Sequence, residues 1–182
     1  MEIKNKQEAL DALAAVTKWV EAQTRDNTSR KEETESGIDS MEYVDLGLPS
    51  KTIWATENIK HENKEAHFTF DEAVEKFGDN LPQKEDWAEL FKYCSHKWDD
   101  DRKGYVITGP NGNNLFLPAA GCHPDNGVSS PGNSGYYWSG SPCSGYANRA
   151  YLLFFYSDYI YPKYDFHRYY GCSVRLVRKP KI

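Results

Sequence analysis

Ala-Tyr-Leu-Leu-Phe-Phe-Tyr, at residues 150–156, is the stretch that decides the fold of this chain. An unbroken run of aromatic and branched aliphatic residues of this length is typical of a strand. Strand alternation sends three large side chains to each face: Tyr151, Leu153 and Phe155 to one, and Leu152, Phe154 and Tyr156 to the other. Both faces are apolar, which is the pattern of a strand buried on both sides. If one face is instead open to solvent, its Leu and Phe side chains are free to contact a partner.

The sequence around this strand is unusually rich in tyrosine. Residues 136–172 hold ten of the 13 tyrosines, together with Trp138 and three phenylalanines, but only five charged residues. A buried core uses little tyrosine because each buried hydroxyl needs a hydrogen-bond partner. Tyr among Ser, Gly and Asn is typical of antibody binding surfaces, so this segment predicts a binding surface. The alternative is an ordinary sheet with a tyrosine-rich face.

N-terminal to this region, local patterns predict a hairpin and two helices. Two β-rich runs, residues 105–108 and 115–117, flank the turn sequence Gly-Pro-Asn-Gly-Asn. Thr69 and Glu72 form a capping-box pattern that begins a helix ending near Phe77. Residues 83–94 carry acidic residues in the first turn and then an apolar face, which predicts a second helix. Glu does not occur after Glu89, which places helices in the first half and strands in the second, an α+β pattern.

The N-terminal region is predicted to form an amphipathic helix, followed by a linker. Residues 7–23 contain no Gly or Pro and place Leu10, Leu13, Val16 and Val20 at helical spacing. This stripe needs a surface to pack on, either its own domain or the same helix of another copy, and a homo-oligomer is one of these two options. The organisation predicted is a helix over residues 1–24, a polar linker over 25–40 and one domain over 41–182.

Composition excludes several classes of partner. The chain has 182 residues and a net charge of -5, without the basic excess that binds nucleic acid. No run approaches the ~20 apolar residues that span a bilayer, which argues against membrane insertion. No apolar signal segment follows Met1, so the sequence predicts a soluble protein without a signal peptide.

Candidate metal ligands and nucleophiles form no recognisable motif. Cys94, Cys122, Cys143 and Cys172 contain no C-x-x-C pair, so free buried thiols are expected. Residues 99–101 (Asp-Asp-Asp) and 122–125 (Cys-His-Pro-Asp) are each interpreted as loop residues and not as metal ligands. The sequence therefore predicts no metal, no cofactor and no enzymatic activity.

Six motifs, in the same order along the chain, resemble the Fibrobacter succinogenes major paralogous domain family, over about residues 42–178. These are Glu-Tyr-Val-Asp-Leu-Gly-Leu-Pro-Ser at 42–50, Trp-Ala-Thr at 54–56, Leu-Pro at 81–82 with Lys-Glu-Asp-Trp at 84–87, Phe-Leu-Pro-Ala-Ala-Gly at 116–121, Gly-Tyr-Tyr-Trp-Ser at 135–139 and Ser-Val-Arg-Leu-Val at 173–177. The resemblance implies a C-type lectin-like fold, in the variant used by formylglycine-generating enzymes, with the N-terminal amphipathic helix added to it.

Some members of that family resemble the variable proteins of diversity-generating retroelements, in which an error-prone reverse transcriptase rewrites Asn codons at the 3′ end of the gene. Their end pattern, A-Y-x-L-x-F-x-S followed by P, R and G-x-S-V-R, is similar to residues 150–175. The resemblance implies ligand-binding positions at the interleaved residues Leu152, Phe154, Tyr156, Asp158, Tyr159, Tyr161, Tyr164, Asp165, Phe166, His167, Tyr169 and Tyr170, with Tyr146 and Asn148 upstream. Cys172 is a further interleaved position, and Cys143 and Gly145 are weaker candidates.

These observations predict a non-enzymatic protein that displays a diversified aromatic surface to a protein or glycan on a cell surface. The resemblance implies an adhesin or receptor-binding protein of phage or prophage origin, located in the phage particle or in the cytoplasm before assembly. A carbohydrate-binding lectin of fixed specificity is the alternative, and an enzyme of the formylglycine-generating kind is a third. The expected structure has Leu152, Phe154, Tyr156, Tyr159, Tyr161 and Tyr164 on one exposed face and Tyr151, Leu153 and Phe155 in the core. The other expected core residues are Trp54, Trp87, Leu90, Leu117, Trp138 and Val174.

Overall fold

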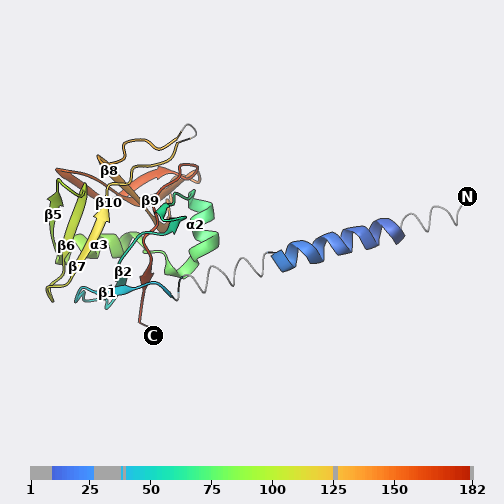
Figure 1. The fold of residues 1–182 in the computed structure, drawn as a ribbon, viewed down its shortest axis with the longest axis horizontal. Coiled ribbons are helices and arrows are strands. Elements are labelled where there is room, and N and C mark those ends of the chain that lie inside the picture. The colour runs from blue at the N-terminus through green and yellow to red at the C-terminus, as the bar shows by residue number, and fades with distance from the viewer. Residues whose placement is uncertain (1–9, 27–37, 39, 125–126, 181–182) are drawn as a thin grey trace, which may run out of the picture. The chain divides into compact units, whose positions relative to one another are not determined.

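The computed structural model describes residues 10–26, 38, 40–124 and 127–180, and the chain divides into two compact units, 1–40 and 41–182. In the first unit residues 10–26 form a helix (Figure 1), which confirms the predicted helix over residues 10–23. Its apolar side chains, Leu10, Leu13, Val16, Trp19 and Val20, are 49–65% exposed.

The predicted boundary of this helix needs a correction. Arg25 and Asp26, assigned to the linker, continue the helix, and an i,i+4 ion pair joins Arg25 to Glu21 across 3.7 Å. Residues 1–9 of the predicted N-terminal helix region and residues 27–37 and 39 of the predicted linker lie outside the described residues. In the described part of the chain, no helix is both long and apolar enough to span a bilayer.

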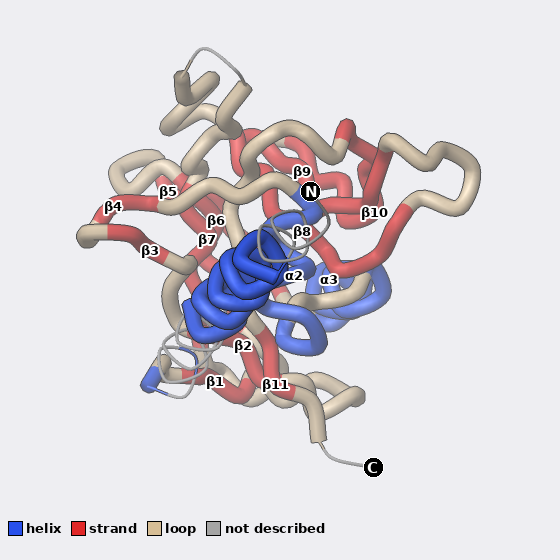
Figure 2. Tube along the Cα trace, turned by 90° about the vertical axis from the view of Figure 1, so that its right-hand side faces the viewer, coloured by secondary structure: helices blue, strands red, loops and turns tan. Residues whose placement is uncertain are grey.

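The second unit contains four small antiparallel sheets and short helices, which confirms the α+β class. One sheet has the order β1 (Tyr43–Asp45), β2 (Ile53–Ala55) and β11 (Val177–Arg178), and β3 (Lys60–His61) pairs with β4 (Lys64–Glu65). A third sheet joins β5 (Ser95–Asp99), β6 (Gly104–Thr108) and β7 (Asn114–Pro118). The fourth joins β8 (Ser134–Pro142), β9 (Arg149–Tyr156) and β10 (Tyr159–His167), with β9 in the centre. Its three strands lie side by side in the view of Figure 2.

The sequence predicted the β6–β7 hairpin and both helices of this unit. Helix α2 (Phe70–Phe77) begins with the predicted capping box, in which the Glu72 amide donates to Thr69 Oγ1 over 3.3 Å and the Thr69 amide donates to Glu72 Oε2 over 2.8 Å. It ends at Gly78, whose φ of 44° suits a residue without a Cβ. A 3-10 turn, η1 (Gly78–Asn80), leads to helix α3 (Lys84–Tyr93).

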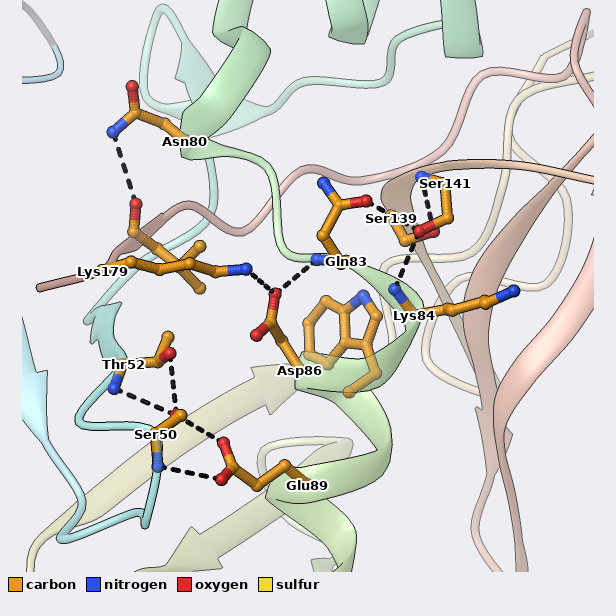
Figure 3. Close-up of polar contacts among 12 residues, drawn as sticks. Ser50, Thr52, Asn80, Gln83, Lys84, Asp86, Glu89, Ser139, Ser141 and Lys179 are labelled. Carbon is orange, nitrogen blue, oxygen red and sulfur yellow. Dashed lines mark hydrogen bonds and ion pairs between the residues drawn. The ribbon is translucent and has the colours of Figure 1, made fainter. Parts of the chain in front are cut away.

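Polar contacts fix helix α3 against three parts of the unit (Figure 3). The buried Asp86 carboxylate accepts from the Gln83 amide at 2.6 Å and from Lys179 Nζ at 2.6 Å. Glu89 accepts from the Ser50 amide at 3.0 Å, which holds the segment before β2. The Lys84 amide donates to Ser141 Oγ at 3.1 Å and so holds β8. These contacts place α3 behind the β8–β9–β10 sheet, with which it is in contact.

All the predicted core residues other than Tyr151 are buried: Trp54, Trp87, Leu90, Leu117, Trp138, Leu153, Phe155 and Val174. Trp87 packs against Trp54 and Tyr137 with ring centroids 4.6 and 5.8 Å apart. Tyr137 stacks on Phe155 at 5.9 Å. The core therefore lies between α3 and the inward face of the β8–β9–β10 sheet, with β6 and β7 contributing to it.

A buried arginine joins separate parts of this core. Arg175 is 1% exposed, and its guanidinium donates to Asn58 Oδ1 at 2.8 Å and to the carbonyls of Ala55 and Phe116, each at 2.9 Å. Asn58 in turn donates to Glu65 Oε2 at 2.7 Å. Burial lowers the pKa of Arg175, and its interactions with Tyr137 and Glu65 oppose that shift.

Candidate binding surface on the β8–β9–β10 sheet

The register of the three strands decides which side chains share the outward face of the sheet. Phe154 of β9 lies opposite Tyr136 of β8 and Tyr161 of β10. Side chains of directly opposed residues point to the same side of a sheet. The neighbouring row, Tyr137, Leu153 and Phe155, faces the core, so Phe154 and its partners face outward.

A bulge in β10 adds two more rings to the outward face. The register advances by three residues on β10, from Tyr161 to Tyr164, while it advances by two on β9, from Phe154 to Leu152. One extra residue reverses the alternation, so that Tyr164 and Phe166 lie on the same face as Tyr161. Pro162, inside this interval, has no amide hydrogen to pair and is suited to a bulge.

The outward rings form a continuous series, which we call the aromatic ladder: Tyr136, Phe154, Tyr156, Tyr159, Tyr161, Tyr164, Phe166, Tyr169 and Tyr170. Neighbouring ring centroids are 4.2 to 6.3 Å apart along the series. Tyr156, Tyr159, Tyr161 and Tyr164 are 38–44% exposed, and Tyr169 is 56% exposed. Because each ring rests on its neighbours, the ladder presents its side chains with little freedom left to lose on binding.

Leu152 is not part of this surface, contrary to the prediction. It is fully buried, because helix α2 packs against β8 at this end of the sheet. Phe70 of α2 meets Trp138 with ring centroids 5.6 Å apart, and Phe166 approaches Trp138 at 6.5 Å. The outward face of the sheet is therefore covered at its Trp138 end and open at its Tyr159 end.

Two other positions differ from their predicted environment. Tyr151, expected in the core, is half-buried on the central strand β9, and Lys84 Nζ lies 4.5 Å from its ring centroid. Cys172, an interleaved position by the resemblance, is fully buried, and its backbone pairs with that of Phe68.

Asp165 and His167 lie on the opposite face of the sheet from the ladder, since they pair with Tyr151 and Arg149. Arg149 Nη1 donates to Asp165 Oδ2 at 2.5 Å, and its Nη2 lies 3.3 Å from His167 Nε2. The Asp165 carboxylate raises the pKa of Arg149. Tyr146 belongs to this polar cluster, with the Arg149 guanidinium 6.0 Å from its ring centroid.

The remaining predicted positions lie in loops. Asp158 is exposed in the turn between β9 and β10, at the open end of the ladder. Asn148 is exposed before β9, and its carbonyl accepts from the Arg168 amide at 3.0 Å. Apart from the buried Leu152, the residues predicted to bind ligand therefore separate into the ladder, the polar cluster around Arg149 and these loops.

A cavity of about 270 Å³ lies at the other end of the ladder, beside Tyr169. His67 and His123 line it, with ring centroids 6.2 Å apart, across Gly171. A Cβ at Gly171 would lie 3.0 Å from His123 Cβ and 3.2 Å from His67 Cβ, so the absent side chain leaves room between the two rings. Burial lowers the pKa of His67, and its Nε2 lies 3.3 Å from the Ala120 carbonyl.

Sequence reasoning missed His67, His123 and Tyr136 as parts of the site. The two histidines are far apart in sequence, and no spacing pattern connects them. Strand alternation gives Tyr136 the same face as Trp138, a predicted core residue, so the pattern by itself favoured a buried Tyr136. Within residues 10–26, 38, 40–124 and 127–180, no three metal-ligating side chains are grouped so that they could hold an ion.

The ladder carries no charge of its own at neutral pH. A hydrogen bond with Tyr159 raises the pKa of Tyr161 to about 12, and burial raises the pKa of Tyr136. The phenol groups of Tyr161 and Tyr136 therefore stay protonated at neutral pH and can both donate and accept hydrogen bonds. The chemistry available at this surface is apolar contact together with neutral hydrogen bonding.

The raised pKa values of buried thiol and phenol groups predict that the free energy of unfolding decreases at alkaline pH. Burial raises the pKa of Cys94 from 9.0 to about 11 and raises the pKa values of Tyr105 and Tyr137 above 10.0. The folded chain thus binds these protons more tightly than the unfolded chain. The resulting stability is complete below pH 9 and decreases as the pH rises through 9 to 11.

Denaturant unfolding at pH 8, 9.5 and 10.5 should show this decrease. Tyr137 should ionise only with unfolding, so a rise of phenolate absorbance at 295 nm should accompany the loss of the fold. Equal stability at pH 8 and 10.5 would contradict the prediction.

Comparisons of the chain with protein-family models, curated proteins and solved structures give no match.

Proposed function

We propose that this protein is a non-enzymatic binding protein that presents the aromatic ladder to a protein ligand, on a C-type lectin-like scaffold. The observation that carries the proposal is the continuous outward row of rings, from Tyr159 to Tyr169, on a sheet whose other face belongs to the core. Large rings held by their neighbours supply contact area at low entropic cost, and their hydroxyls add adaptable hydrogen bonds.

The separation of outward and inward residues supports the further proposal that the outward positions are diversified. Tyr156, Tyr159, Tyr161 and Tyr164 are exposed, whereas Leu153 and Phe155, which the family pattern treats as scaffold, are fully buried. A change at an exposed position leaves the buried row intact. The sheet is thus suited to changes of binding specificity without changes of fold, as expected of an adhesin or receptor-binding protein of a phage.

A lectin of fixed specificity is the second candidate, and the cavity beside Tyr169 favours it. Its lining offers the polar side chains of His67, Thr69, Glu72 and His123 next to the ring of Tyr169. Small-ligand sites usually combine apolar rings with a few polar groups that fix the orientation of the ligand.

The coding DNA distinguishes the two candidates. Diversification predicts that codons at the outward positions derive from AAC or AAT, and that a near-copy of the segment with adenines at those sites lies beside a reverse transcriptase gene. If the codons are ordinary, and neither the near-copy nor the reverse transcriptase gene lies near the gene, a lectin of fixed specificity is the better proposal.

Binding measurements test the surface itself. We expect the double variant Tyr159→Ala/Tyr161→Ala to lose at least tenfold in affinity for intact bacterial cells that the wild-type protein binds. Tyr93→Ala is the matched control, because Tyr93 lies on α3 outside the ladder and is similarly exposed, at 43%. Protease treatment of the cells should abolish binding, whereas loss only after glycosidase treatment favours the lectin. Equal binding by the double variant and the control would refute a role for the ladder.

A further inference from the structure

Two buried cysteines lie in a small patch of strand pairing behind the ladder. Phe68 and Cys172 exchange both backbone hydrogen bonds, at 2.9 and 2.8 Å. Cys122 and Ser129 likewise exchange both, at 3.1 and 2.7 Å. The two pairs belong to neighbouring segments, because His123 and Gly171 also pair in the antiparallel sense.

The hydrogen bonds between His123 and Gly171 fix the position of the two cysteines relative to each other. The His123 amide donates to the Gly171 carbonyl at 2.7 Å, and the Gly171 amide donates back at 2.9 Å. The next residues along the two segments, Cys122 and Cys172, therefore face each other as a non-hydrogen-bonded pair. Such pairs have Cα atoms about 4.5 Å apart and side chains on the same face. A disulfide needs Cα atoms roughly 4.4–6.8 Å apart.

The two thiols share one buried environment. Cys172 is fully buried and Cys122 is 6% exposed, and neither is in a disulfide in this structure. Burial and the neighbouring Cys122 both raise the pKa of Cys172. The other two cysteines lie elsewhere, Cys94 at the end of α3 and Cys143 after β8, beside Tyr151.

We propose that Cys122 and Cys172 are an oxidation site that forms an intramolecular disulfide with a small disulfide such as oxidised glutathione as oxidant. One thiolate attacks oxidised glutathione, which forms a mixed disulfide and releases one glutathione thiolate. The second cysteine, after losing its proton, attacks the protein sulfur of the mixed disulfide and releases the second glutathione. Two protein thiols are oxidised, and one glutathione disulfide is reduced to two thiols. Because the folded chain buries both groups, we expect the exchange mainly during folding.

This bond would close a loop that contains β8, β9, β10 and the whole ladder. The loop of about 50 residues restricts the unfolded chain and raises the midpoint of thermal unfolding by on the order of 10 °C. The inference does not depend on the proposed function, since it rests on the register of the two segments alone.

The experiment refolds the full chain from denaturant in a reduced and oxidised glutathione buffer, with a parallel sample kept in a phosphine reductant. Alkylation with N-ethylmaleimide in denaturant, which exposes the buried thiols, should label two thiols in the oxidised sample and four in the reduced one. Peptide mass spectrometry should find Cys122 linked to Cys172, and the oxidised protein should melt about 10 °C higher.

The double variant Cys94→Ser/Cys143→Ser is the matched control and should keep both the link and the shift. Cys122→Val should lose both. The comparison of oxidised and reduced wild-type protein decides the question even if that variant does not fold. Four alkylated thiols after refolding with oxidised glutathione, or a link through Cys94 or Cys143, would overturn the proposal.

Discussion

Replacing Arg175 with Met is expected to lower the free energy of unfolding by about 3–5 kcal/mol, since it removes the charged member of a buried network. The methionine keeps much of the apolar stem but leaves three acceptors, on Asn58, Ala55 and Phe116, without their donors. Each buried polar group left without a partner costs about 1–3 kcal/mol. A loss of this size comes close to the lower end of the roughly 5–15 kcal/mol that stabilises a typical domain.

Urea unfolding followed by tryptophan fluorescence would measure the effect of Arg175→Met. Lys97→Met is the control, because Lys97 is exposed on β5 and its replacement should change stability by less than about 0.5 kcal/mol. A loss below about 1 kcal/mol for Arg175→Met, with an unchanged denaturant slope, would show that the network does not stabilise the core.

The second large effect is expected for Trp138→Ala, at about 3–5 kcal/mol. Trp138 is fully buried, packs against Phe70 and donates from Nε1 to the Phe68 carbonyl at 2.7 Å. Its truncation leaves a cavity beneath α2 and removes that hydrogen bond. Tyr161→Ala, in contrast, should stay within about 0.5 kcal/mol of the wild type, because Tyr161 is 40% exposed.

Thermal and denaturant unfolding of both variants would test this difference. It is also a stability test of the proposed binding surface, independent of any ligand. If Tyr161→Ala costs as much as Trp138→Ala, the ladder is part of the core and the proposal of a binding surface is wrong.

Both ends of helix α2 are set by residues close together in the sequence. Thr69, Glu72 and Gly78 act within a few residues of one another, so the sequence alone predicted both ends of the helix. The predicted core residues of β9, Leu153 and Phe155, follow from strand alternation in the same way. Such predictions hold because the deciding interactions are local along the chain.

Positions that depend on distant segments could not be predicted in this way. Leu152 and Phe154 share one face of β9 and look alike in the sequence. Only the packing of α2 against β8 buries Leu152 while Phe154 stays at the surface.

The sequence by itself therefore determined the short helices, the β6–β7 hairpin, most of the core and the aromatic character of the C-terminal third. Tertiary structure decided the extent of the ladder, because the bulge after Tyr161 turns Tyr164 outward and Asp165 to the opposite face. It also decided the meeting of His67 with His123 and of Cys122 with Cys172. Backbone pairing between distant segments sets both contacts. Because backbone hydrogen bonds do not depend on which side chains the paired residues carry, the sequence alone does not predict them.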